Sequence, residues 1–142
     1  MITYAPMEDV LAVGLEELLN GSTVPVGFPD PTPTVLDGIT AGSRVPAALA
    51  GPAVKGFVRV TVLNDVDDGV TRTLTVDTEV FCTSYARGMA IGERIRGILR
   101  TETRIAGVVL DRRTTGGPKE VPWDDNNTIR RFLSTHRIST RR

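Results

Sequence analysis

A strand pattern that runs directly into a helix pattern constrains this chain more than any other feature. From Val70 to Thr83 apolar and polar side chains alternate, with Phe81 as the exception on the polar face. Ser84 can then cap a helix that we expect to run to about Arg100. The apolar stripes comprise Leu74, Val76, Val80 and Cys82 in the strand and Ala90, Ile91, Ile95, Ile98 and Leu99 in the helix. This order predicts a helix packed on a sheet whose polar face meets solvent or another subunit.

Four further elements follow from periodicity. An acidic amphipathic helix is expected near residues 7–19, ended by Asn20-Gly21. A strand at 57–63 should form a hairpin with the strand at 70–83, through a turn-forming loop at 64–69. Two more strands are expected at 104–113 and 129–139. The length of 142 residues suits one domain, residues 1–142, with a single core.

Residues 25–54 have a different character, because six of the nine prolines lie between Pro25 and Pro52. Proline removes backbone donors, so this stretch is expected to be irregular with at most short edge strands. Long irregular segments usually have a function or are flexible. We favour an arm that orders against a neighbouring subunit, and a plain surface loop is the alternative.

Three glycines in the second helix, Gly88, Gly92 and Gly97, lower its intrinsic stability by up to ~1 kcal/mol each relative to alanine. Close packing should compensate for this cost. We expect small residues at Ala86, Ala90 and Gly97 to let the helix approach its own sheet, or alternatively a helix of another subunit.

Charge is distributed unevenly along the chain. Three basic and nine acidic residues occur up to Val70, a balance of −6, and because the chain has 17 residues of each sign the remainder carries +6. Such asymmetry can orient a subunit against a neighbour or against nucleic acid. Two solvated faces of opposite sign would explain it equally well.

No residues form a recognisable catalytic, metal or cofactor motif. The single histidine and single cysteine, His136 and Cys82, fall in no nucleophile motif. The acidic loop at 64–69 lacks the ligand spacing of a calcium loop, and Gly116-Gly117-Pro118-Lys119 lacks the context of a phosphate loop. We therefore expect a protein without cofactor, metal or enzymatic activity.

Compartment signals point to a reducing cytoplasm. One cysteine cannot form an internal disulfide, the N-terminus lacks the character of a signal peptide, and no apolar stretch approaches the ~20 residues of a membrane span.

Two segments carry a resemblance to a known family. The first is the run Val80-Phe81-Cys82-Thr83-Ser84-Tyr85-Ala86, which leads into a helix. The second is the segment 117–124, Gly-Pro-Lys-Glu-Val-Pro-Trp-Asp, which precedes a terminal strand with Arg131-Phe132. With the preceding acidic helix, Pro/Gly-rich stretch and hairpin, they resemble the tail-terminator proteins of long-tailed bacteriophages. The resemblance covers nearly the whole chain. It implies an α+β fold with two helices on a mainly antiparallel sheet.

The resemblance also implies a structural virion protein of the tail and neck, assembled in the host cytoplasm. Such subunits form a homo-hexameric ring that caps the tail tube, stops addition of tube protein and docks the head connector or stopper. Genome DNA passes through the channel, and we expect at most weak, salt-sensitive contact with its phosphates. A head-to-tail contact between unlike patches can close such a ring.

Basic residues around the second helix and the loop after it are the candidates for the channel or for the adjoining ring. Charge reversal of Arg112 and Arg113 is expected to impair joining and to leave the subunit folded. Trp123 either anchors its loop to the core or fills a pocket on a partner. The full set of candidate interface or channel residues is Arg94, Arg96, Arg112, Arg113, Lys119, Trp123, Arg130 and Arg131.

Three alternatives remain open. Head-completion or neck connector proteins share this size and helix-on-sheet layout. A nucleic-acid-binding module would use the basic C-terminal half. A small hydrolase would require a pocket in which His136 and Cys82 converge.

Overall fold

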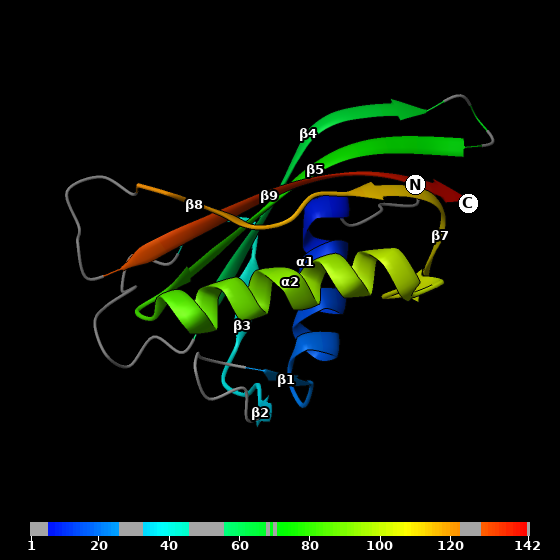
Figure 1. Ribbon diagram of the computed structural model, residues 1–142. Helices are drawn as coiled ribbons and strands as arrows, with labels where there is room; N and C mark the ends of the chain where they lie inside the picture. Colours follow the sequence, from blue (N-terminus) through cyan, green and yellow to red (C-terminus); the bar gives the residue numbers. More distant parts are fainter. Residues whose placement is uncertain are drawn as a thin grey trace.

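The computed structural model describes residues 6–25, 33–45, 56–67, 69, 71–122 and 129–141 (Figure 1). Two helices, α1 (Met7–Leu19) and α2 (Tyr85–Thr101), pack against a seven-stranded, mainly antiparallel sheet. The α+β class with two helices on such a sheet is therefore confirmed.

The sheet has the strand order β3-β4-β5-β9-β7-β6, with β8 also paired to β9. Its members are β3 (Thr40–Gly42), β4 (Phe57–Asp67), β5 (Thr71–Cys82), β6 (Arg104–Ile105), β7 (Val108–Thr115), β8 (Lys119–Val121) and β9 (Arg130–Arg141). Only the pair β3–β4 is parallel among these described strands. The terminal strand β9 thus lies inside the sheet, between β5 on one side and β7 and β8 on the other.

One core fills the space between the helices and the inner face of the sheet. The expected stripes of both helices are buried, including Leu11 and Leu15 of α1 and Ile91 and Ile95 of α2. Strand residues opposite them are equally buried: Val58, Val60, Leu74, Val76, Val80, Cys82 and Ile138. A second, small cluster of Phe57, Phe81 and Ile129 lies apart from this core, which explains why Phe81 breaks the polar pattern of β5.

Helix α2 approaches the sheet at Gly88 and Gly92. A Cβ on Gly88 would lie 2.1 Å from Cε2 of Phe132, and one on Gly92 would lie 2.5 Å from Cβ of Pro118. At Gly97 a Cβ would meet only Nη1 of Arg94, at 3.7 Å. The helix does pack closely on its own sheet, but the expectation that Gly97 provides the room was wrong.

The loop expected at 64–69 is shorter than the sequence suggested. Strand β4 continues to Asp67 after a bulge at Val62/Asn64, so Asp67 pairs with Arg72. An ion pair between Arg72 and Asp65 supports this extension. The hairpin of β4 and β5 consequently projects past the helices, and residues 63–67 are all exposed (Figure 1).

The single strand expected at 104–113 was also wrong. Ala106 and Gly107 both have positive φ, 50° and 83°, and form a two-residue turn between β6 and β7. Positive φ at both central residues is the geometry that suits a tight hairpin. Ile105 of this hairpin packs against Gly14, where a Cβ would lie 2.1 Å from its Cγ2.

Part of the Pro/Gly-rich stretch belongs to the core of its own subunit. Its described residues form the short strands β1 (Thr23–Pro25), β2 (Pro33–Val35) and β3, and both Leu36 and Ile39 are buried. Backbone groups of Ile39 bond the side chain of Asn20: the N–H donates to Oδ1 at 3.0 Å and the carbonyl accepts from Nδ2 at 2.9 Å. Residues 33–45 therefore contribute to the core of their own subunit, and a contact of this stretch with a neighbouring subunit stays a prediction. Residues 26–32 and 46–55 lie outside the described residues.

Candidate interaction surface

The predicted basic residues are divided among separate parts of the sheet and α2. Register places Lys119 opposite Leu133 and Val121 opposite Arg131, whereas Arg113 lies opposite Ile138. Ile138 is seven positions beyond Arg131 on β9, which corresponds to about 23 Å along a strand. The candidates therefore do not form one patch. Trp123 lies outside the described residues, and so does the side chain of Arg112.

Arg113 belongs to the structure of the subunit rather than to an exposed interface. Its Nη1 donates to the carbonyl oxygen of Leu99 at 3.4 Å and also to that of Glu102. The last carbonyls of a helix lack partners within the helix, and a cation there also complements the helix dipole. Reversal of this charge is therefore expected to destabilise the fold, and whether the reversed subunit stays folded remains a prediction.

Two candidates on α2 have local contacts. Arg94 donates from Nε to the hydroxyl of Ser22 at 3.2 Å. Nη1 of Arg96 lies 3.8 Å from a carboxylate oxygen of Glu93, one turn earlier. Nε of Arg96 has no hydrogen-bond partner among the described groups. The Arg96 side chain keeps 38% of its surface exposed. Arg94 therefore ties α2 to Ser22, which follows α1, and Arg96 remains available at the surface.

A charged network occupies the face of the sheet away from the helices. Arg59 donates from Nε and Nη2 to the two carboxylate oxygens of Glu79, each at 2.8 Å. Arg131 donates from Nη1 to Glu79 at 3.3 Å and from Nη2 to the carbonyl of Pro122 at 3.1 Å. The Glu79 side chain is only 9% exposed, and its hydrogen bonds raise the pKa of Arg59. Arg131 thus connects β9, β5 and the end of β8.

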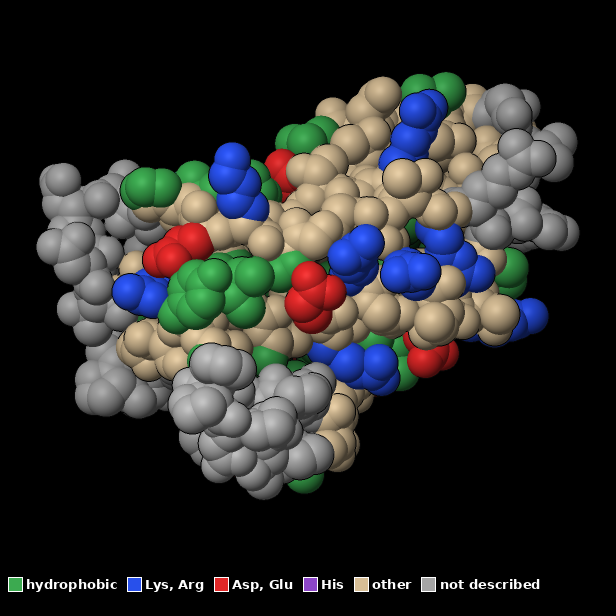
Figure 2. Space-filling model, viewed as in Figure 1, with side chains coloured by type: hydrophobic (Ala, Val, Ile, Leu, Met, Phe, Trp, Pro, Cys, Tyr) green, Lys and Arg blue, Asp and Glu red, His purple; other side chains and the backbone are tan. Residues whose placement is uncertain are grey.

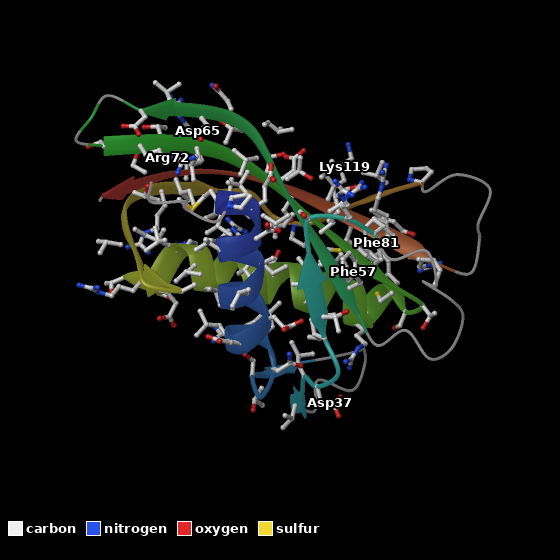
Figure 3. The ribbon with its side chains drawn as sticks, turned by 180° about the vertical axis from the view of Figure 1, so that it is seen from behind. Asp37, Phe57, Asp65, Arg72, Phe81 and Lys119 are labelled. Carbon is white, nitrogen blue, oxygen red and sulfur yellow. The ribbon has the colours of Figure 1, made fainter. Side chains whose placement is uncertain are left out.

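This network was not anticipated from the sequence. Arg59 also lies over the ring of Phe81, with 5.6 Å between Cζ and the ring centroid, and Phe57 packs against the same ring. Figure 3 places Phe57, Phe81 and Lys119 toward one end of the sheet and the pair Asp65 and Arg72 toward the other. The alternation along β5 placed Glu79 and Phe81 on the strand face opposite the buried Leu74 and Val76, as expected. Local patterns could not predict that Arg59 and Arg131 would converge there, because strand order decides which strands flank β5.

Exposed groups gather at the end of the sheet where β9 begins. The guanidinium of Arg130 lies over the ring of Tyr85, 5.8 Å from its centroid, and 3.6 Å from the carboxylate of Glu120. Tyr85 is 50% exposed, although its ring also meets Phe132 edge-on. Lys119 is exposed on the neighbouring strand. This end can therefore contact another surface through both charge and aromatic area.

His136 and Cys82 do not converge. Cys82 is paired with Arg130, and His136 is six residues further along β9, about 20 Å away by strand geometry. Oγ1 of Thr78 lies 3.1 Å from Nε2 of His136, in a buried site where burial and then the nearby charge of Arg96 lower the histidine pKa to about 4. The Cys82 thiol donates to the carbonyl of Ser84 at 3.1 Å, and burial raises its pKa. The small-hydrolase alternative required a pocket in which His136 and Cys82 converge, and the two side chains do not converge.

The acidic hairpin end makes ordinary structural contacts. Asp65 pairs with Arg72, and Oδ1 of Asp67 accepts the backbone N–H of Gly69 at 2.8 Å. Across the described ranges, no three His, Cys, Asp or Glu side chains are placed to hold a metal ion. The part of the chain that the structure covers also contains no helix with the length and apolar character needed to cross a bilayer.

Two comparisons with known proteins complete these observations. No model of a known protein family matches the chain, and no curated protein matches it either.

Proposed function

We propose that this protein is a tail-terminator subunit, which assembles into a ring on the end of a phage tail tube and joins the tail to the head connector. The observation that carries the proposal is the one-sided placement of the helices. Because α1 and α2 share one core on the inner face, the opposite face of the long sheet carries neither helix, and beyond the buried cluster of Phe57, Phe81 and Ile129 it stays accessible. A subunit that works by fitting between neighbours requires surfaces of this kind.

The outer face of the sheet is polar over much of its length. Asp77 and Thr135 lie opposite each other on β5 and β9, where the Thr135 hydroxyl donates to the Asp77 carboxylate at 2.6 Å. Thr135 and Arg137 are exposed on β9. A polar surface of this composition suits a contact that forms late in assembly, since the subunit must first stay soluble on its own.

The projecting hairpin provides a second surface. Leu63 and Val66 are 57% and 56% exposed near its end, where β4 has no described partner other than β5. Exposed apolar residues on an unpaired strand edge favour docking to another chain. In the proposed assembly this hairpin contacts the tube protein or the connector.

Direct contact with DNA has a minor role in this proposal. Figure 2 shows more Lys and Arg than Asp and Glu side chains on the face that carries α2. Contacts between such a face and phosphates weaken steeply with added salt. Weak contact would let the genome pass, as a channel requires.

The test combines the purified protein with tail tubes grown from the tube protein of the same phage. We expect rings at the tube ends in electron micrographs and arrest of further tube growth. A matched control omits the protein or supplies it with the hairpin residues Leu63 and Val66 changed to serine, which should reduce capping without unfolding the subunit. Tubes that grow equally long in its presence, or phage particles that assemble normally without the gene, would refute the proposal.

A further inference from the structure

The four acidic residues of α1 divide into two pairs with different roles. Oε1 of Glu16 accepts the backbone N–H of Ala41 at 3.0 Å, and Oε1 of Glu8 accepts that of Val62 at 3.4 Å. Asp9 and Glu17 are instead exposed. Glu8 and Glu16, the inner pair, therefore serve the fold by bonding β4 and β3. Asp9 and Glu17, the outer pair, have no such role.

The outer pair forms a stripe with an exposed apolar residue at its centre. Asp9, Val13 and Glu17 follow each other at intervals of four residues, a spacing that places them along one side of a helix. Val13 is 53% exposed. We call Asp9, Val13 and Glu17 the acidic stripe.

The arginines near α2 divide in the same way. Arg87 donates to the carbonyl of Asp37 at 2.9 Å, Arg94 bonds Ser22, and Arg113 bonds carbonyls at the end of α2. Arg100, in the last turn of α2, and Arg104, which begins β6, are both exposed. We call Arg100 and Arg104, together with the half-buried Arg96 one turn earlier, the basic stripe.

The two stripes lie on different elements, the acidic stripe on α1 and the basic stripe on the second half of α2 and the start of β6. Helix α2 lies in front of α1 in Figure 1, and α1 lies in front when the molecule is turned by 180° in Figure 3. Each helix presents its exposed residues away from the shared core. One copy can therefore contact a second copy through its acidic stripe and a third through its basic stripe.

We propose that the acidic stripe of one copy docks on the basic stripe of the next, in a head-to-tail contact centred on Val13. Opposite charge orients the two helices, and Val13 contributes apolar contact at the centre. A contact between unlike patches repeats until it closes into a ring. This inference rests on the proposed function, because a ring requires repeated contact between copies of the chain.

Charge reversal of each stripe provides the first test. Asp9→Arg with Glu17→Arg makes both stripes basic, and Arg100→Glu with Arg104→Glu makes both acidic. We expect each double variant to weaken self-association at least about tenfold in sedimentation at low salt, where exposed charges interact most strongly. An equimolar mixture of the two variants should associate again, since every contact in an alternating assembly then joins opposite charges.

The control is Arg44→Glu, which changes an exposed arginine outside both stripes. It should associate like the wild type, and circular dichroism should show that all variants are folded. Failure of the mixture to associate would overturn the inference, as would a wild-type protein that stays monomeric at high concentration in low salt. Loss of duplex DNA retention in the Arg100/Arg104 variant with unchanged sedimentation would also overturn it, and would assign the arginines to phosphate instead.

Cross-linking tests the geometry directly. In a Cys82→Ser background, one chain carries Val13→Cys and another carries Thr101→Cys, which is exposed at the end of α2. A short bismaleimide should join the two chains when mixed and should join neither variant to itself. Self-joining of the Val13→Cys chain would indicate a symmetric contact between α1 helices and would refute the head-to-tail arrangement.

These outcomes separate the inference from the proposed function. If the wild-type protein forms rings that cap tubes, but mixing the two charge-reversed variants does not restore association, the proposed function stands and this contact is discarded. Rescued assemblies that do not arrest tube growth would support the contact and discard the function.

Discussion

Gly88 of α2 lies directly against the ring of Phe132 on β9, so closely that a Cβ would come within 2.1 Å of Cε2. The ring is fully buried, and no flexible side-chain end can move aside. We expect Gly88→Ala to destabilise the protein by about 1 to 3 kcal/mol through overpacking. Chemical denaturation measures this change.

Gly97→Ala is the matched control, because a Cβ there meets only an arginine end at 3.7 Å. The helix preference of alanine should make that variant neutral or more stable by up to ~1 kcal/mol. Equal effects of the two substitutions would contradict the packing of α2 described above.

Removal of the Glu79 charge should disturb the outer-face network. Arg59 and Arg131 both bond the carboxylate of Glu79 in the wild type. In Glu79→Gln the two guanidinium groups would lie near each other without that negative charge. We expect a loss of about 1 to 3 kcal/mol, below the full effect of a buried pair because both arginines are partly exposed. Thermal and urea unfolding provide the measurement.

Glu93→Gln serves as its comparison, since Glu93 is exposed and lies 3.8 Å from Arg96. That variant should change stability by less than about 0.5 kcal/mol. A Glu79→Gln protein as stable as the Glu93→Gln protein would show that the network contributes little.

Arg113→Ala should weaken the end of α2. The substitution leaves the carbonyls of Leu99 and Glu102 without their guanidinium donor, which we expect to cost about 1 to 3 kcal/mol. Hydrogen exchange should then be faster in the last turn of α2. Arg100→Ala removes an exposed arginine from the same turn and should leave exchange unchanged; if both variants exchange alike, Arg113 is not a cap.

His136 should make stability fall at acidic pH. Its pKa is lowered to about 4 in the folded state from an ordinary value of 6.5, so the folded protein holds the neutral ring and binds fewer protons than the unfolded chain. The contribution is fully present above pH 6.5 and is lost as pH falls toward 4. Its total size is on the order of 3 kcal/mol.

Carboxylates also titrate in the lower part of this range, so the comparison with His136→Gln isolates the histidine. Urea unfolding between pH 7 and pH 4.5 should show a steeper decline in the wild type than in the variant. Parallel declines would mean that the ring is protonated as easily in the folded protein as in the unfolded chain.

Periodicity identified the main elements because burial of one face imposes it locally. The stripe of α1, the capped start of α2 at Ser84 and the alternation of β5 all depend on residues close together in the sequence. The Ser84 hydroxyl accepts the N–H of Arg87 at 3.3 Å, as its position before the helix predicted. Such signals need no knowledge of the partner strand.

Errors arose where pairing between strands overrides local preference. The acidic stretch after Asn64 reads as a turn, yet β5 holds it as strand through Asp67. The turn at Ala106-Gly107 was missed because alanine seldom adopts positive φ. Strand β8 is three residues long and is defined by its pairing with β9 rather than by its own composition.

The sequence by itself determined the α+β class, the positions of both helices and the separation of acidic from basic residues along the chain, because each follows from the order of side chains. Only the tertiary structure decided which charges serve the fold and which remain outside. Glu16 and Arg113 have backbone partners, whereas Glu17 and Arg100 are exposed. The reason is physical: packing decides which group comes within hydrogen-bond distance of a charge, and the partners of Glu16 and Arg113 lie 11 to 25 residues away in the sequence.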